Sequence, residues 1–206
     1  VVNMNYAAVD QGVEKVTEVE IPASWADIEV AEEKVDENLP EWIRKIQIPV
    51  NKMKGDNIPV SDFADLPDGT MPNGTSKYEK RGIAVNVPVW NSEKCIQCNQ
   101  CSYVCPHAAI RPFLVSGEET EKAPEGFVTV PAKGKGMESY RYRIQTAVLD
   151  CTGCGSCANV CPAPEKAITM LPLDEHKDEE KNWEYAIALS EKKNPLGVNT
   201  VKGSQF

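Results

Sequence analysis

The sequence predicts an α+β fold built from two related halves at residues 87–173. Three observations support this fold class. All eight cysteines of the 206-residue chain fall into two runs, which begin at Cys95 and Cys151 and share the template C-x2-C-x2-C-x3-C-P. An apolar segment that reads as a strand precedes each run, and another follows it. The prolines that end the runs suit the first position of a short helix, and short helices are expected from Pro106 and near residues 164–167.

Each half is therefore expected to supply a strand, a cysteine loop, a helical turn and a second strand. The entering strands are predicted at 87–90 and 143–149, and the exiting strands at 108–115 and 167–171. The 56-residue offset between the runs predicts a pseudo-twofold arrangement. Residues 116–137, between the halves, are predicted to form an inserted surface loop.

The spacing of the cysteines predicts two [4Fe–4S] clusters. A cubane cluster takes one thiolate on each of four irons, and three cysteines in a tight loop can wrap three of the corners. In this pattern of a bacterial-type two-cluster protein, the fourth cysteine of each run ligates the other cluster. The first cluster is assigned to Cys95, Cys98, Cys101 and Cys161. The second cluster is assigned to Cys151, Cys154, Cys157 and Cys105.

Zinc and disulfides are the alternative uses of these cysteines. Zinc sites commonly combine two distant C-x2-C pairs, sometimes with histidine. Disulfide frameworks belong mostly to small secreted chains. The first residues here have neither the basic region nor the apolar core of a secretory signal. The paired triplets favour iron–sulfur clusters, and a zinc-stabilised interaction module stays as the structural alternative.

The charge and hydropathy of the chain argue against two classes of partner, nucleic acids and membranes. The formal net charge is −9, and no basic patch stands out, which argues against nucleic acid. The sequence lacks an apolar run of 18 residues, so no membrane span is expected. Clusters with exposed sulfide favour a reducing, oxygen-poor compartment, and a cytoplasmic location is expected.

The N-terminal part is expected to hold two further segments. Residues 1–24 read as the tail of a preceding domain. Residues 25–86 read as a small, loop-rich α/β linking domain, with short helices at 29–38 and 40–46. Trp25 is expected to be a core anchor of this domain.

Beyond the cluster domain, residues 174–206 are expected to form a helix and an extended linker to a following domain. The helix is predicted over 179–189 and ends before the Asn-Pro pair at 194–195.

The order of these features resembles an internal segment of the pyruvate:ferredoxin (flavodoxin) oxidoreductases. Residues 5–10 are similar to the end of that family's third domain. Residues 78–84, which read Tyr-Glu-Lys-Arg-Gly-Ile-Ala, resemble the motif that names its small linking domain. The strand at 87–90 and both cysteine runs follow, as in the family's ferredoxin-like domain. Residues 202–206 resemble the approach to its thiamine-binding domain.

The resemblance implies what the parent protein does. Members of this family decarboxylate pyruvate oxidatively, form acetyl-CoA and pass electrons one at a time to ferredoxin or flavodoxin. The resemblance implies thiamine diphosphate, magnesium, a third [4Fe–4S] cluster and a homodimeric assembly for the parent protein, with those further cofactors outside this segment. The segment itself would hold two clusters and no catalytic residue. A free-standing ferredoxin-like carrier, or an electron-transfer subunit of another oxidoreductase, is the alternative.

Overall fold

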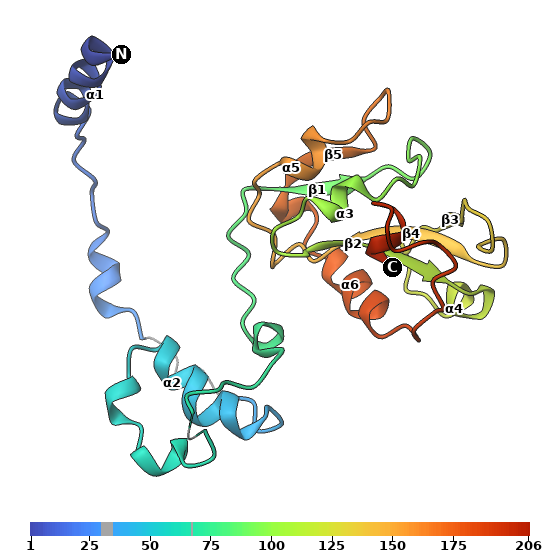
Figure 1. Ribbon diagram of the computed structural model, residues 1–206. Coiled ribbons are helices and arrows are strands. Elements are labelled where there is room, and N and C mark those ends of the chain that lie inside the picture. The colour runs from blue at the N-terminus through green and yellow to red at the C-terminus, as the bar shows by residue number, and fades with distance from the viewer. Residues whose placement is uncertain (30–34, 67) are drawn as a thin grey trace. The chain divides into compact units, whose positions relative to one another are not determined.

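The computed structural model describes residues 1–29, 35–66 and 68–206, which form two compact units, Val1–Met71 and Pro72–Phe206 (Figure 1). The helix predicted at 29–38 falls largely on residues 30–34, outside the described part. No described helix is long and apolar enough to cross a membrane.

The first unit consists of helices and turns. Its elements are α1 (Val2–Glu14), a 3-10 turn (Ala23–Asp27), a π-helical turn (Ile43–Gln47), α2 (Ile48–Asn51) and two 3-10 turns (Gly55–Asn57 and Val60–Phe63). Ile43 and Ile46 are buried. Trp25 is 62% exposed, so the expectation that it anchors a core is wrong for this unit. None of the residues of its 3-10 turn is buried.

The second unit holds both cysteine runs between short strands. Its elements are a 3-10 turn (Thr75–Tyr78), β1 (Asn86–Trp90), α3 (Gln100–Tyr103), β2 (Ile110–Val115), α4 (Gly117–Glu121), β3 (Val130–Pro131), β4 (Arg141–Thr146), α5 (Ser156–Asn159), β5 (Ile168–Pro172), a 3-10 turn (Leu173–Glu175), α6 (Glu179–Ile187) and a 3-10 turn (Gly203–Gln205). The unit is a mixed helix and sheet domain, which agrees with the predicted α+β class.

The strands form two antiparallel sheets, and each joins the two halves of the sequence. β1 pairs with β5, so that Trp90 lies opposite Ile168. β2 pairs with β4, and β3 adds to the other edge of β4. The first strand of each half therefore pairs with the last strand of the other half (Figure 1). All four predicted strands are present, with ends displaced by at most three residues.

The helical turns lie inside the cysteine runs and not behind them. α3 and α5 each carry the third cysteine of a run. Behind the fourth cysteine, Ala108 and Lys166 have positive φ of 49° and 44°. A left-handed residue cannot continue a right-handed helix, so the helices expected from Pro106 and near 164–167 do not form.

The inserted segment is part of the core and not only a surface loop. Its residues Phe127 and Met137 are buried, and β3 extends the sheet. α4 begins with a capping box, in which Ser116 Oγ accepts from Glu119 N and Ser116 N donates to the Glu119 carboxylate. The insert therefore stabilises the same unit that holds the cysteines.

The C-terminal helix packs on the three-stranded sheet formed by β2, β4 and β3. α6 packs against β4 (Figure 1). Its residue Trp183 is buried beside Ala109 and Ala147. Further on, Phe206 meets the ring of Tyr142 edge to face, with 6.3 Å between ring centroids. The chain after α6 therefore returns to the core around the first cysteine run.

Glu119→Gln is expected to lower the free energy of unfolding at pH 7 by about 1–2 kcal/mol. Burial would raise the pKa of Glu119, but hydrogen bonds from Lys192, Ser116 N and Ser190 lower it to about 2. Since the folded pKa lies below the ordinary 4.5, this stabilisation is present above pH 4.5 and is lost as the pH falls toward 2. Denaturant unfolding followed by circular dichroism measures the loss. The exposed neighbour Glu118→Gln is the control, and equal losses in both variants would refute the role of Glu119.

Candidate metal centres

Two cavities of the second unit are lined by cysteines, and each combines both runs. The first cavity is lined by Cys95, Cys98, Cys101 and Cys161. The second cavity is lined by Cys105, Cys151, Cys154 and Cys157. All eight cysteines are free thiols. Each cavity therefore receives three cysteines from one run and the fourth from the other.

Apolar side chains from the sheets complete both cavities. Trp90, Tyr142 and Ile144 contribute to the first, and Ile110 and Met170 to the second. The exchanged strand pairing explains this arrangement, because it brings the end of each half against the loop of the other. The fold thus places the sulfur atoms against a largely apolar wall.

The two cysteine loops have the same backbone conformation. Gln97 and Asn99 in the first run, and Gly153 and Gly155 in the second, all have positive φ between 59° and 75°. These turns direct backbone N–H groups toward sulfur. Gln97 N donates to Cys95 Sγ at 3.4 Å, and Gly153 N donates to Cys151 Sγ at 3.3 Å.

The fourth cysteine of each run also accepts a backbone hydrogen bond. Ala109 N donates to Cys105 Sγ and Ala167 N donates to Cys161 Sγ, both at 3.3 Å. Such bonds favour the charged thiolate over the neutral thiol. The first and the fourth cysteine of each run therefore both have a backbone N–H directed at their sulfur.

The cavities nevertheless oppose ionisation of free thiols. Burial, with the charges of Cys95 and Cys98, raises the pKa of Cys101 to about 12. Burial also raises the pKa of Cys157 to about 11. The pKa of Cys154 is lowered by hydrogen bonds from Ser156. Four thiolates in one apolar cavity therefore need a cationic centre, which a metal core supplies.

The donor set fits a four-iron cluster. Four thiols surround each cavity, and a [4Fe–4S] core takes one thiolate on each iron. Among residues 1–29, 35–66 and 68–206, no three histidine, cysteine or carboxylate side chains are arranged to hold one metal ion. The four thiols that line each cavity match the four corners of one such core in number.

Gln97 and Asn99 do more than replace the glycines of the second loop. Both side chains are only 1% exposed. Gln97 Nε2 donates to Pro131 O at 2.8 Å, and Lys133 N donates to Gln97 Oε1 at 2.7 Å. Asn99 Nδ2 donates to Lys202 O at 2.9 Å. The first loop is thereby fastened to the insert and to the C-terminal segment, a role that the spacing of the cysteines does not indicate.

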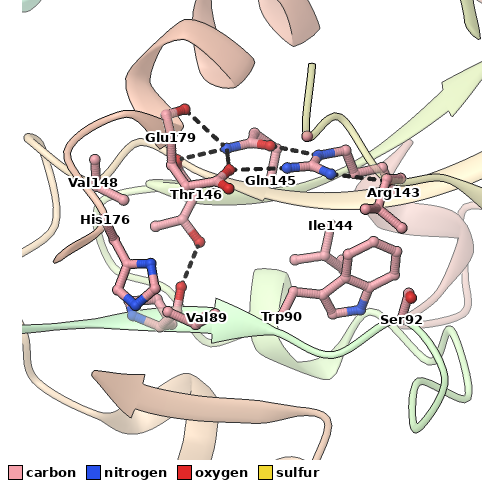
Figure 2. Close-up of a pocket in the computed structure, with 13 residues that line it drawn as sticks. Val89, Trp90, Ser92, Arg143, Ile144, Gln145, Thr146, Val148, His176 and Glu179 are labelled. Carbon is pink, nitrogen blue, oxygen red and sulfur yellow. Dashed lines mark hydrogen bonds and ion pairs between the residues drawn. The ribbon is translucent and has the colours of Figure 1, made fainter. Parts of the chain in front are cut away.

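A third cavity is lined by polar side chains of β4 and α6 (Figure 2). Figure 2 shows Arg143, Gln145 and Glu179 joined in one network. Arg143 donates to Glu179 Oε2 at 2.9 Å, and Gln145 donates to the same oxygen at 3.0 Å. Trp90 Nε1 and His176 Nε2 are buried at this cavity without a protein partner. Such a polar cavity suits ordered water, and it is separate from the cysteine sets.

The fold and the two thiol-lined cavities define the class of protein, a ferredoxin-like domain for two [4Fe–4S] clusters. A family model described as a 4Fe-4S dicluster domain matches residues 91–164. A second model, described as EKR, a domain of unknown function, matches residues 29–84.

The relatives identify the family. A pyruvate:ferredoxin oxidoreductase of Moorella thermoacetica is 55% identical over 208 residues, which cover 100% of this chain and 18% of the relative. A pyruvate-flavodoxin oxidoreductase of Enterobacter agglomerans is 50% identical over 208 residues, which cover 100% of this chain and 17% of the relative. The chain belongs to the pyruvate:ferredoxin (flavodoxin) oxidoreductase family. It spans less than a fifth of the length of these curated relatives.

Proposed function

We propose that this chain is the electron-transfer segment of a pyruvate:ferredoxin oxidoreductase. In this proposal it relays single electrons from a thiamine-bound intermediate to ferredoxin or flavodoxin, while the parent protein converts pyruvate to acetyl-CoA. The observation that carries the proposal is the pair of cavities, each lined by four cysteines from both runs. The identity of 47–55% to three pyruvate oxidoreductases over the whole chain supports the pyruvate-linked role.

The proposed ligands are the two cysteine sets that line the cavities. Cys95, Cys98, Cys101 and Cys161 would hold the first cluster. Cys105, Cys151, Cys154 and Cys157 would hold the second cluster. When bound, a [4Fe–4S] cluster accepts and releases one electron at a time. The backbone N–H groups that donate to sulfur offset its negative charge, and the apolar walls exclude water from the site.

The proposed organisation follows the repeat in the sequence. The 56-residue offset of the cysteine runs and the exchange of strands between the halves support a pseudo-twofold cluster domain at 87–173. Residues 25–86 would form the linking domain, and 1–24 and 174–206 would connect to neighbouring domains. Thiamine diphosphate, magnesium and a third cluster would belong to those neighbours, in a homodimeric cytoplasmic parent.

The full-length protein provides the test. After anaerobic purification, pyruvate and CoA together are expected to reduce it, and electron paramagnetic resonance is expected to show the signals of reduced [4Fe–4S] clusters. Double alanine substitution of Cys98 and Cys154 should remove two of these signals and stop electron delivery to flavodoxin. A free-standing carrier predicts clusters that dithionite reduces and pyruvate does not. Zinc in place of iron would refute the proposal.

A further inference from the structure

Residues 79–84, which read Glu-Lys-Arg-Gly-Ile-Ala, have no role in the cysteine sets described above. They end the match to the family model of unknown function. In the structure they belong to the compact unit Pro72–Phe206, which also holds both cysteine runs. Their contacts within this unit show which part of the domain they serve.

Lys80 reaches two carboxylates beside the second cysteine run. Its Nζ pairs with Asp150 Oδ2 and lies 3.4 Å from Glu180 Oε1. Asp150 directly precedes Cys151, and Glu180 belongs to α6. All three side chains are partly buried, so solvent and salt screen these charges less than they screen surface pairs. Lys80 therefore links residues 79–84 to the second cysteine loop and to α6.

The backbone of the segment follows the same loop. Gly82 N donates to Leu149 O at 3.0 Å. Gly82 has φ of +57°, and a Cβ there would lie 3.2 Å from Leu149 Cδ2. Ala84 is buried, and a Cβ on Gly153 would lie 3.2 Å from the Cβ of Ala84. Glycine at 82 and a small residue at 84 thus let the segment lie close against residues 149–153.

The other two charged residues of the motif contact each other. Arg81 pairs with Glu79, and the side chain of Arg81 is 69% exposed. Of the three charged residues, Lys80 is thus the one that pairs with Asp150, the residue directly before Cys151. This contrast separates its role from general surface charge.

We propose that residues 79–84 clamp the second cysteine loop, with Lys80 as a positioning residue that sets the potential of the second cluster. This inference rests on the proposed function, because it concerns a cluster held by Cys105, Cys151, Cys154 and Cys157. Two uncompensated carboxylates near this site would oppose the addition of an electron to an already anionic centre. Lys80 neutralises part of that charge, so it favours the reduced state and also holds Asp150 in place.

A redox titration of the full-length protein, followed by electron paramagnetic resonance, tests this inference. The signal of the second cluster is the one that Cys154→Ala removes. Lys80→Met is expected to move its midpoint to a more negative potential and to leave the first cluster unchanged. Asp150→Asn is expected to move the same midpoint to a more positive potential. Opposite shifts report charge, because a purely structural disturbance would move both variants in the same direction.

Two controls complete the test. Lys77→Met removes an equal charge three residues away, where the lysine lies over the ring of Tyr78, and its midpoint is expected to stay close to the wild type. Lys80→Arg keeps the charge and is expected to retain most of the wild-type potential. Loss of the second cluster alone in Lys80→Met would support the clamp.

Several outcomes would overturn the inference. They are unchanged midpoints in Lys80→Met, equal shifts of both clusters, or an Asp150→Asn midpoint that stays or becomes more negative. If Lys80→Met does not fold, the sign of the Asp150→Asn shift decides. If the wild-type protein lacks two iron clusters, the proposed function itself is refuted. If both clusters are present and their midpoint potentials do not change in Lys80→Met, only this inference is refuted.

Discussion

Cys161→Ala is expected to remove the same electron paramagnetic resonance signal as Cys98→Ala, and not the one that Cys154→Ala removes. Cys161 belongs to the second cysteine run, but it lines the cavity that also contains Cys95, Cys98 and Cys101 of the first run. Cys105→Ala is expected to behave like Cys154→Ala for the same reason. Each single variant should retain one intact cluster and lose up to about four of roughly eight irons. Iron analysis and spectra of the reduced protein measure both effects.

The four cysteine variants, at positions 98, 105, 154 and 161, serve as controls for one another. Each removes one thiol, so a general loss of stability would weaken both signals together and would not separate the variants into two pairs. If each run instead bound its own cluster with four consecutive cysteines, Cys161→Ala would match Cys154→Ala. That grouping would contradict the exchanged ligand sets.

Arg143→Met is expected to lower the free energy of unfolding by about 2–3 kcal/mol, below the range for breaking a fully buried ion pair, because the side chain of Glu179 is 35% exposed. Arg143 is 4% exposed. It donates to Glu179 Oε2 and to Val128 O at 2.9 Å each, and its guanidinium lies 4.5 Å from the ring centre of Phe127. Burial lowers the pKa of Arg143, while Glu179 opposes that shift. Methionine would fill much of the volume but would leave the Glu179 carboxylate without its cation.

Denaturant or thermal unfolding, followed through both cluster absorbance and circular dichroism, measures this loss. Arg111→Met is the matched control, because Arg111 is exposed and lies over the ring of Trp183 at 5.5 Å. Its expected cost is about 1 kcal/mol or less. Adding Glu179→Gln to Arg143→Met should recover part of the loss, since it removes the unpaired charge. Equal costs at positions 143 and 111 would contradict the buried network.

The cysteine pattern predicted much of this domain because the ligand geometry of a cubane restricts the chain. The two runs predicted where the cysteine loops lie, and the apolar segments beside them predicted the strands, although the short helices formed inside the runs and not after them. The predicted helix at 179–189 is confirmed as Glu179–Ile187. These features depend on local patterns that a single sequence displays.

Other features depend on contacts between distant residues, which a local pattern does not reveal. Phe127 and Met137 made the insert part of the core, although its charged stretches resemble a surface loop. Gln97 and Asn99 lie among the cysteines of the first run, yet their side chains bind backbone groups about 35 and 100 positions away. Lys80 is one of three consecutive charged residues, and its pair with Asp150 joins positions 70 residues apart.

Anomalous scattering at the iron absorption edge, measured on crystals of the anaerobically prepared protein, locates the metal at both cysteine sets. Two compact groups of four irons are expected. One group should be bound by Cys95, Cys98, Cys101 and Cys161, and the other by Cys105, Cys151, Cys154 and Cys157. Single zinc ions or sulfur–sulfur bonds at these positions, or clusters bound by four cysteines of one run, would contradict this assignment.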